Sequence, residues 1–193
     1  MKNTKNKLPL IINSIIIVFE IIGCIMCAKH GLSVLQYYTV LSNIFALITS
    51  TLYVAFYLKT KNSIPIAVSF LRYASTVCLT LTFAVVLFIF VPLAGFSVMV
   101  EGVQIFHHLL CPVLSFISFV FFEKRKTLSK RHIFLSLIPT FTYAAVIIVL
   151  NILRVVEGPY PFLMVYRQSV VVSVIWFFVI NGMALLTAAL LRI

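Results

Sequence analysis

Six long apolar runs, separated by short polar stretches, constrain this chain more than any other feature of its sequence. They cover about residues 8–28, 35–58, 65–94, 103–122, 133–153 and 168–191. Because a helix of about 20 apolar residues crosses the hydrocarbon core of a bilayer, each run predicts one transmembrane helix. We expect the longest run to tilt, or to break near Pro92 and Gly95. A membrane β-barrel is excluded, because its strands are short and alternate in polarity.

The composition supports a membrane protein with little mass outside the bilayer. Hydrophobic residues make up 63% of the 193 residues and charged residues 10%, whereas about a quarter of the residues in a soluble domain are charged. A soluble globular protein and a disordered chain are therefore excluded. We predict an all-α, six-helix membrane bundle that forms one domain over residues 1–193. Any chemistry must come from residues inside the membrane or at its rim.

Basic residues predict the topology. The net charge is +11, and eleven of the basic residues fall in the segments expected on one side of the membrane. These are Lys2, Lys5, Lys7, Lys59, Lys61, Lys124, Arg125, Lys126, Lys130, Arg131 and Arg192. The other side has only Lys29, Arg154 and Arg167. Because cytoplasmic loops are enriched in Lys and Arg, both termini are predicted to be cytoplasmic in a multi-pass protein of the cell membrane. The positive charge then reflects topology and predicts no nucleic-acid partner.

Arg72 and the cysteines lie within the apolar runs. Arg72 is expected to extend its guanidinium to the cytoplasmic headgroups, or else to oppose a negative charge on a substrate. Cys24 and Cys27 form a CxxC pair that predicts either helix packing or a thiol oxidoreductase site. Packing is favoured because the flanking residues are apolar. With Cys78 and Cys111 also in apolar runs, no disulfide framework of a secreted protein is expected.

Two of the runs have their polar and small residues on a single helical face. The second run has Gln36, Thr39, Asn43, Ala46 and Ser50 at steps of three and four residues. The fourth has Gln104, His108, Cys111, Ser115 and Ser118 at similar steps. Such spacing forms one stripe on each helix. The small residues are typical of helix–helix packing.

Thr39, His107 and His108 are candidate catalytic residues. Both helices begin at the outer face in the predicted topology, so these residues lie about 6–8 Å below that boundary at about 1.5 Å of rise per residue. A hydroxyl and an imidazole at one depth are the chemistry of a nucleophile and its general base. The polar stripe favours His108, and a histidine that merely bonds a neighbouring helix is the competing interpretation. Adjacent histidines without an HExxH motif predict no metal site, and no cofactor is expected.

Other polar residues are candidates for the same site. Gln36 and Asn43 lie about one helical turn on either side of Thr39 and are candidate donors to an oxyanion. Further candidates for substrate binding are Glu20, Asn151, Arg154 and Tyr160. The segment 157–162 contains two prolines, which favour either an ordered lid over the site or a plain turn with an interfacial aromatic anchor.

Three short motifs resemble a known family. They are Gln36–Asn43 (QYYTVLSN), Phe106–Pro112 (FHHLLCP) and Pro159–Leu163 (PYPFL). Together they resemble a bacterial branch of the androgen-induced protein family. Its animal members are six-span threonine hydrolases that cleave fatty acid esters of hydroxy fatty acids with one intramembrane Thr and one His. The resemblance implies a nucleophile at Thr39. The animal spacing to proline selects His107 as the base, and the bacterial spacing selects His108.

Two functional hypotheses follow. The first is an intramembrane lipid-ester hydrolase, with membrane lipids as partners and a lipid ester as substrate. The alternative is a small-molecule transporter or a substrate-binding membrane subunit without hydrolase activity. The hydrolase requires the Thr39 hydroxyl and a histidine at one site, whereas the transporter requires polar ligands around a cavity.

Overall fold

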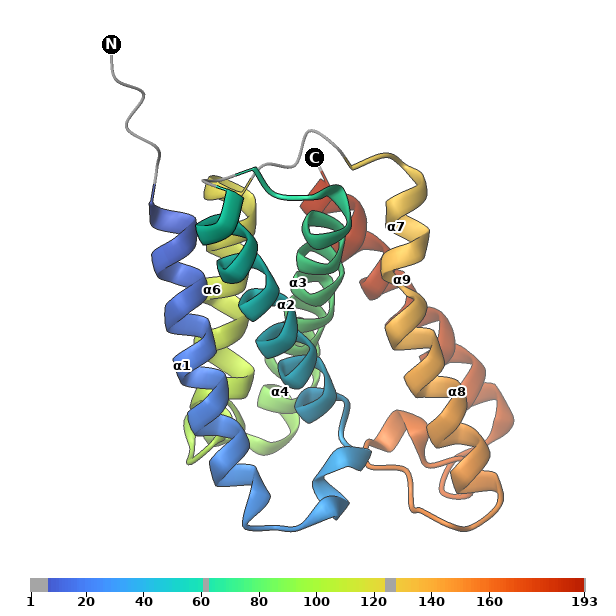
Figure 1. The fold of residues 1–193 in the computed structure, drawn as a ribbon. Helices are drawn as coiled ribbons and strands as arrows, with labels where there is room; N and C mark the ends of the chain where they lie inside the picture. The colour runs from blue at the N-terminus through green and yellow to red at the C-terminus, as the bar shows by residue number, and fades with distance from the viewer. Residues whose placement is uncertain (1–6, 61–62, 124–127, 193) are drawn as a thin grey trace.

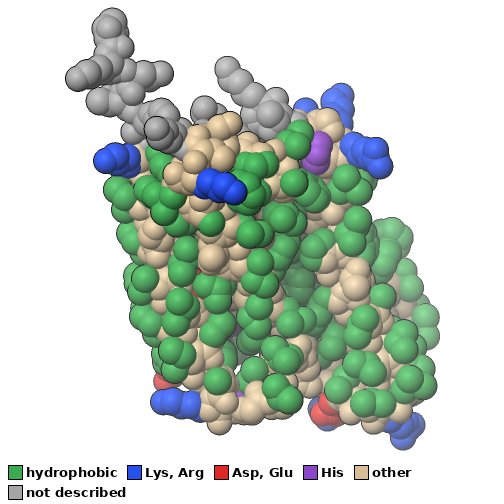
Figure 2. Space-filling view, viewed as in Figure 1, with side chains coloured by type: hydrophobic (Ala, Val, Ile, Leu, Met, Phe, Trp, Pro, Cys, Tyr) green, Lys and Arg blue, Asp and Glu red, His purple; other side chains and the backbone are tan. Residues whose placement is uncertain are grey.

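The computed structural model describes residues 7–60, 63–123 and 128–192, and every regular element in these ranges is a helix. Six helical spans are long and apolar enough to cross a membrane. They are Leu8–Ala28, Tyr38–Thr60, Ile66–Ala94, Ile105–Phe122, Arg131–Ile152 and Val170–Arg192. The prediction of an all-α, six-span membrane protein is therefore confirmed. Figure 2 shows the apolar belt of the molecule, with Lys and Arg side chains gathered at its two ends.

The second span begins later than predicted. Helix α1 (Leu8–Ala28) has the expected bounds, but a 3-10 turn over Leu32–Gln36 precedes helix α2 (Tyr38–Thr60). Tyr37 between them is extended, with ψ of 128°. The sequence predicted that Gln36 lies on one helical stripe with Thr39. In the structure Gln36 precedes α2 and does not lie on that stripe. The apolar run continues through the turn, so its hydrophobicity does not reveal where the helix starts.

Prolines explain two of the three π-helical stretches in the third and fourth spans. The third comprises α3 (Ile66–Val85), a π-helical stretch (Val86–Phe90) and α4 (Val91–Ala94). The fourth comprises a π-helical stretch (Ile105–Leu110), α6 (Cys111–Ile117) and a second π-helical stretch (Ser118–Phe122). Pro92 and Pro112 each follow a π-helical stretch. A proline ring clashes with the carbonyl four residues earlier, and the wider π turn gives it room. The third span thus continues past Pro92 and ends at Gly95, where φ is 85°.

Four further α-helices complete the fold of the described residues. Helix α5 (Ser97–Val100) is a single turn between the third and fourth spans. The fifth span is divided into α7 (Arg131–Ser136) and α8 (Ile138–Ile152). It divides at Leu137, so that Pro139 falls in the first turn of α8, where its missing N–H costs no helical hydrogen bond. Helix α9 (Val170–Arg192) forms the sixth span.

The helices form a four-helix body with a pair of helices beside it (Figure 1). In the body, α1 packs against α2 and α6, and α3 packs against α2 and α6. Helix α9 packs against α3 and α7. Helix α8 is joined to the start of α2 by hydroxyl groups, because the Tyr38 hydroxyl lies 2.7 Å from Thr140 Oγ1. The Tyr143 hydroxyl donates to the Gln36 carbonyl at 2.8 Å.

Helix α1 begins and α9 ends at the same end of the bundle (Figure 1). We call this the terminal end, and the opposite end, with connections 29–37, 95–104 and 153–169, the distal end. The side of the membrane that each end faces stays a prediction. Several basic residues used for that prediction lie outside the described residues, namely Lys2, Lys5, Lys61, Lys124, Arg125 and Lys126.

Arg72 lies in the core rather than at the headgroups, contrary to the expectation that it extends to the membrane surface. Its side chain is fully buried, and its Nη2 lies 3.2 Å from Glu123 Oε1. It also donates to the hydroxyls of Ser50 and Ser115. Glu123 in turn accepts a hydrogen bond from Asn13 at 3.0 Å. A buried guanidinium is stable when it is paired and hydrogen-bonded, so Arg72 joins four helical segments instead of reaching solvent.

Candidate functional site

Thr39 lies in the first turn of α2, near the distal end of the bundle. Its side chain is 9% exposed. The Thr39 hydroxyl lies 3.3 Å from the Tyr160 hydroxyl, and the Thr39 backbone N–H donates to the same phenol oxygen at 3.2 Å. Tyr160 comes from the connection between α8 and α9, so two segments 121 residues apart meet at Thr39.

A cavity of about 830 Å³ lies at the distal end, and we call it the distal cavity. Five of the nine residues predicted for a site line it. These are Gln36, Thr39, His107, His108 and Tyr160. The structure therefore brings the predicted hydroxyl and both predicted imidazoles to the walls of one cavity. Within the described residues, no hydrogen bond joins Thr39 Oγ1 to either imidazole.

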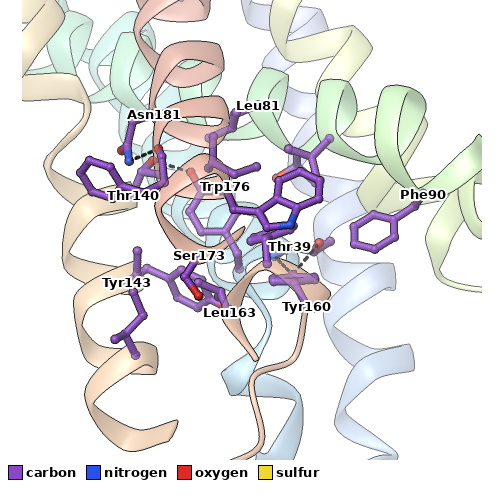
Figure 3. A pocket seen from close by; sticks show the side chains of 18 of the residues that line it. Thr39, Leu81, Phe90, Thr140, Tyr143, Tyr160, Leu163, Ser173, Trp176 and Asn181 are labelled. Carbon is purple, nitrogen blue, oxygen red and sulfur yellow. Dashed lines mark hydrogen bonds between the residues drawn. The ribbon is translucent and has the colours of Figure 1, made fainter. Parts of the chain in front are cut away.

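A second, smaller and more apolar space of about 120 Å³ lies between α2, α3, α8 and α9, and we call it the lateral pocket. Figure 3 shows Thr39 and Tyr160 together at one side of it, with Trp176 projecting into it from α9. Its walls are mainly aliphatic and aromatic. Four residues line both spaces, namely Thr39, Val86, Phe90 and Tyr160. The Thr39 hydroxyl thus lies where an apolar pocket adjoins a more polar cavity.

Aromatic rings surround Tyr160. It stacks on Phe162 with ring centroids 5.2 Å apart, and it also contacts the rings of Tyr37 and Phe90. Burial raises the pKa of Tyr160, an effect that exceeds the lowering by its hydrogen bonds to Thr39. The phenol therefore keeps its proton at neutral pH and is available as a hydrogen-bond donor.

The two histidines have different surroundings. His108 is half-buried, and its Nδ1 lies 2.6 Å from the Val98 carbonyl oxygen. A carbonyl accepts but never donates, so Nδ1 carries a proton here, and in the neutral ring Nε2 is then the free base. His107 is 1% exposed and faces α1, where its Nε2 lies 3.8 Å from Glu20 Oε2. The π winding explains why His107 is the more buried. A π-helix rotates by fewer degrees per residue than an α-helix. The residue that shares the buried face with Cys111 is therefore His107, four positions earlier, and not His108, three positions earlier.

The remaining predicted residues lie outside the walls of both spaces. The Asn43 amide donates to the carbonyls of Thr39 and His107 and joins α2 to the fourth span. Donation to an oxyanion would require Asn43 to release one of these carbonyls. Asn151 bonds the Val156 carbonyl and the Val165 N–H. Asn151 thereby closes the connection between α8 and α9 into an ordered loop.

Arg154 and Glu20 also lie away from the walls that Thr39 lines. The Arg154 guanidinium lies 4.9 Å from the centre of the Tyr166 ring, in the connection after α8. Glu20 is fully buried in α1. Sequence reasoning did not predict that Glu20 and Cys27 both face His107. The signal was present in the sequence, because positions seven residues apart on a helix share a face.

Comparisons of the chain with protein families, curated proteins and solved structures find no match. The interpretation of the site therefore rests on the chain's own residues and their geometry. These define a membrane protein in which a distal cavity of mixed polarity adjoins an apolar lateral pocket.

Proposed function

We propose that this protein is an intramembrane lipid-ester hydrolase with Thr39 as its nucleophile. One observation carries the proposal. The Thr39 hydroxyl lies at the boundary between the apolar lateral pocket and the distal cavity that holds both histidines. An ester with a long acyl chain has the same division, because its chain is apolar and its carbonyl and leaving group are polar.

His108 is the proposed general base. Its Nδ1–H donates to the Val98 carbonyl, which leaves Nε2 free to accept the Thr39 proton. This is the division of roles that a general-base histidine requires. Hydrogen bonds between catalytic groups are often long without substrate and shorten once it binds. The lack of a Thr39–His108 hydrogen bond in the described residues is therefore compatible with this role.

The proposed reaction proceeds through an acyl-enzyme. The Thr39 oxygen attacks the ester carbonyl while His108 accepts the hydroxyl proton, and His108 returns that proton to the departing alkoxide. Water then releases the acid in the reverse sequence. The Tyr160 hydroxyl, 3.3 Å from Thr39 Oγ1, is the nearest donor to the oxyanion.

The resemblance to the androgen-induced protein family supports the same substrate class, a fatty acyl ester of a membrane lipid or hydroxy fatty acid. The lateral pocket supports it independently, because aromatic and aliphatic side chains suit an acyl chain. The distribution of basic residues supports a location in a cell membrane with both termini in the cytoplasm, and the resemblance supports a bacterial source.

Fluorophosphonate labelling tests the proposal, because this probe reacts with activated hydroxyls. We expect labelling of the protein in lipid nanodiscs to be lost in Thr39→Val and in His108→Gln. The matched control is Thr51→Val, because the Thr51 hydroxyl is exposed and donates to the Leu47 carbonyl of its own helix. Labelling that persists in Thr39→Val, or that requires His107 rather than His108, contradicts the respective assignment.

The alternative is a small-molecule transporter or substrate-binding subunit. It is favoured by one observation, namely that the Thr39 hydroxyl contacts the Tyr160 phenol rather than an imidazole. This alternative predicts no labelling of the folded protein. It also predicts binding of a small water-soluble ligand in the distal cavity that Thr39→Val leaves unchanged.

A further inference from the structure

A thiol, an imidazole and a carboxyl are aligned along α1, apart from the contacts of Thr39. The Cys27 Sγ lies 3.9 Å from His107 Nδ1. On the other side of the same ring, His107 Nε2 lies 3.8 Å from Glu20 Oε2. The two ring nitrogens thus face two different partners. These partners, Glu20 and Cys27, lie about two turns apart on α1.

The spacing of residues on α1 produces this alignment. Glu20, Gly23 and Cys27 are at positions i, i+3 and i+7, which share one helical face. The His107 ring lies directly against Gly23, where an added Cβ would come within 2.3 Å of His107 Nε2. Only glycine leaves room for the ring between the carboxyl and the thiol. The ring is therefore held at a fixed position rather than packed loosely against the helix.

The partners favour one arrangement of the His107 proton. When Glu20 is ionised it can only accept, so it favours the proton on Nε2, and the unprotonated Nδ1 then faces the thiol. A nucleophile, a base and a group that orients the base are the three parts of an activated nucleophile. Because the thiolate is the reactive form of cysteine, an imidazole that accepts its proton increases reactivity.

Two of the three groups lie at the wall of the distal cavity, and Glu20 is buried behind them. Cys27 and His107 both line it, although the side chains of Glu20, Cys27 and His107 are all buried. His107 Nε2 has no hydrogen-bond partner in the part of the chain that the structure describes. The cavity also adjoins the lateral pocket at Thr39 and Tyr160. A ligand with its acyl chain in the pocket can place its carbonyl in the cavity.

We propose that Cys27, His107 and Glu20 form a second nucleophilic centre that accepts an acyl group from an ester. In this step the Cys27 thiol transfers its proton to His107 Nδ1, and the sulfur forms a bond to the carbonyl carbon. The carbon–oxygen bond to the alcohol breaks, and the departing alkoxide takes the proton from His107. The product is an S-acyl thioester at Cys27. Glu20 is a positioning residue, because it acts on the acyl group only through His107.

The first experiment measures the alkylation rate of each cysteine in the folded protein. The protein in nanodiscs is treated with limiting iodoacetamide, and site occupancy is followed by mass spectrometry. Cys24 is the internal control, because it lies one turn away on α1 and is more exposed than Cys27. We expect Cys27 to react at least about tenfold faster than Cys24, against the order of their exposure.

Variants then assign the activation. His107→Gln is expected to lower the Cys27 rate to that of Cys24 or below, and Glu20→Gln to lower it severalfold. The matched control is His132→Gln, because His132 bonds Ser129 and lines neither the distal cavity nor the lateral pocket; it should leave the Cys27 rate unchanged. Each variant is compared only if it elutes as a single folded species. The comparison of Cys27 with Cys24 in the unsubstituted protein requires no variant and remains decisive if a substitution prevents folding.

The second experiment detects the acyl group. The protein is incubated with p-nitrophenyl butyrate, and a hydroxylamine-labile butyryl group is expected on Cys27 but not on Cys24. The proposal is overturned if Cys27 reacts no faster than Cys24, or if its rate is the same in His107→Gln. A fast thiol without a butyryl adduct overturns the acyl-transfer step. These readouts do not involve a hydroxyl nucleophile, so they are distinguishable from failure of the Thr39 proposal.

Discussion

The buried pair of Arg72 and Glu123 gives the sharpest test of the fold. The perturbation is Glu123→Gln, which keeps the side-chain volume and removes the charge. Both side chains are almost completely buried, at 0% and 3% exposure. Glu123 Oε1 also accepts hydrogen bonds from Asn13 and Ser118. Removing one member of a buried ion pair costs about 3–5 kcal/mol, because the other charge stays buried without its partner.

A double-mutant cycle isolates the pair. We expect Glu123→Gln and Arg72→Met each to lower the free energy of unfolding by about 3–5 kcal/mol. The double variant should lose at least about 2 kcal/mol less than the sum, because it leaves no uncompensated charge. The assay is reversible unfolding in mixed micelles with increasing SDS, followed by circular dichroism.

A second ion pair is the matched control. Arg167 and Glu157 are paired in the distal connection, but their side chains are 64% and 67% exposed. Arg167→Met should therefore change the free energy of unfolding by no more than about 1 kcal/mol. The reasoning is refuted if the Arg72 and Glu123 variants lose as little as this control, or if their losses are additive.

Three further predictions concern the distal end. Gly23→Ala should lower stability and slow alkylation of Cys27, because the new Cβ displaces the His107 ring; unchanged thermal unfolding and thiol reactivity would contradict this. Tyr160→Phe should reduce ester hydrolysis at least about tenfold, since one oxyanion donor contributes about 10²–10³ in rate, while fluorophosphonate still labels Thr39; full turnover would remove the donor role. Asn151→Ala should increase proteolytic cleavage between residues 153 and 169, because its two hydrogen bonds close this connection; an unchanged cleavage rate argues against that bracing role.

The six spans were predictable because hydrophobicity over about 20 residues is a local property of the sequence. The π-helical stretches and the 3-10 turn were only partly predictable. Pro92 and Pro112 mark where the third and fourth spans change winding, but the sequence does not decide between a break and a π-helical stretch. The 3-10 turn that contains Gln36 is as apolar as its neighbours. Its boundary depends on contacts such as that of Tyr143 with the Gln36 carbonyl.

The interpretation of Arg72 was wrong for a different reason. Its partner Glu123 lies just beyond the fourth apolar run, 51 residues away. Only the packing of α3 against α6 and the segment after it brings the two charges together. The same limit applies to Glu20, because its contact with His107 joins the first span to the fourth and no local pattern predicts it.

The candidate site combined local and non-local signals. The sequence predicted that Thr39 and the histidines lie at a common depth, which follows from helical rise alone. It could not predict that Tyr160, 121 residues later, contacts Thr39. Nor could the sequence predict the contacts of His107 and His108. The π-helical stretch that contains them changes which residues lie on the buried face of the helix.

The exposed face of α9, beside the four-helix body, has a consequence for measurements on this protein. Phe177 lines the lateral pocket and is 54% exposed on the lipid-facing surface of α9. A hydrophobic ligand in the bilayer therefore meets the pocket by diffusion within a leaflet rather than from bulk water. Occupancy of the pocket then follows the mole fraction of ligand in the lipid. Diluting the lipid with detergent lowers that occupancy even when the total ligand concentration in the tube is constant.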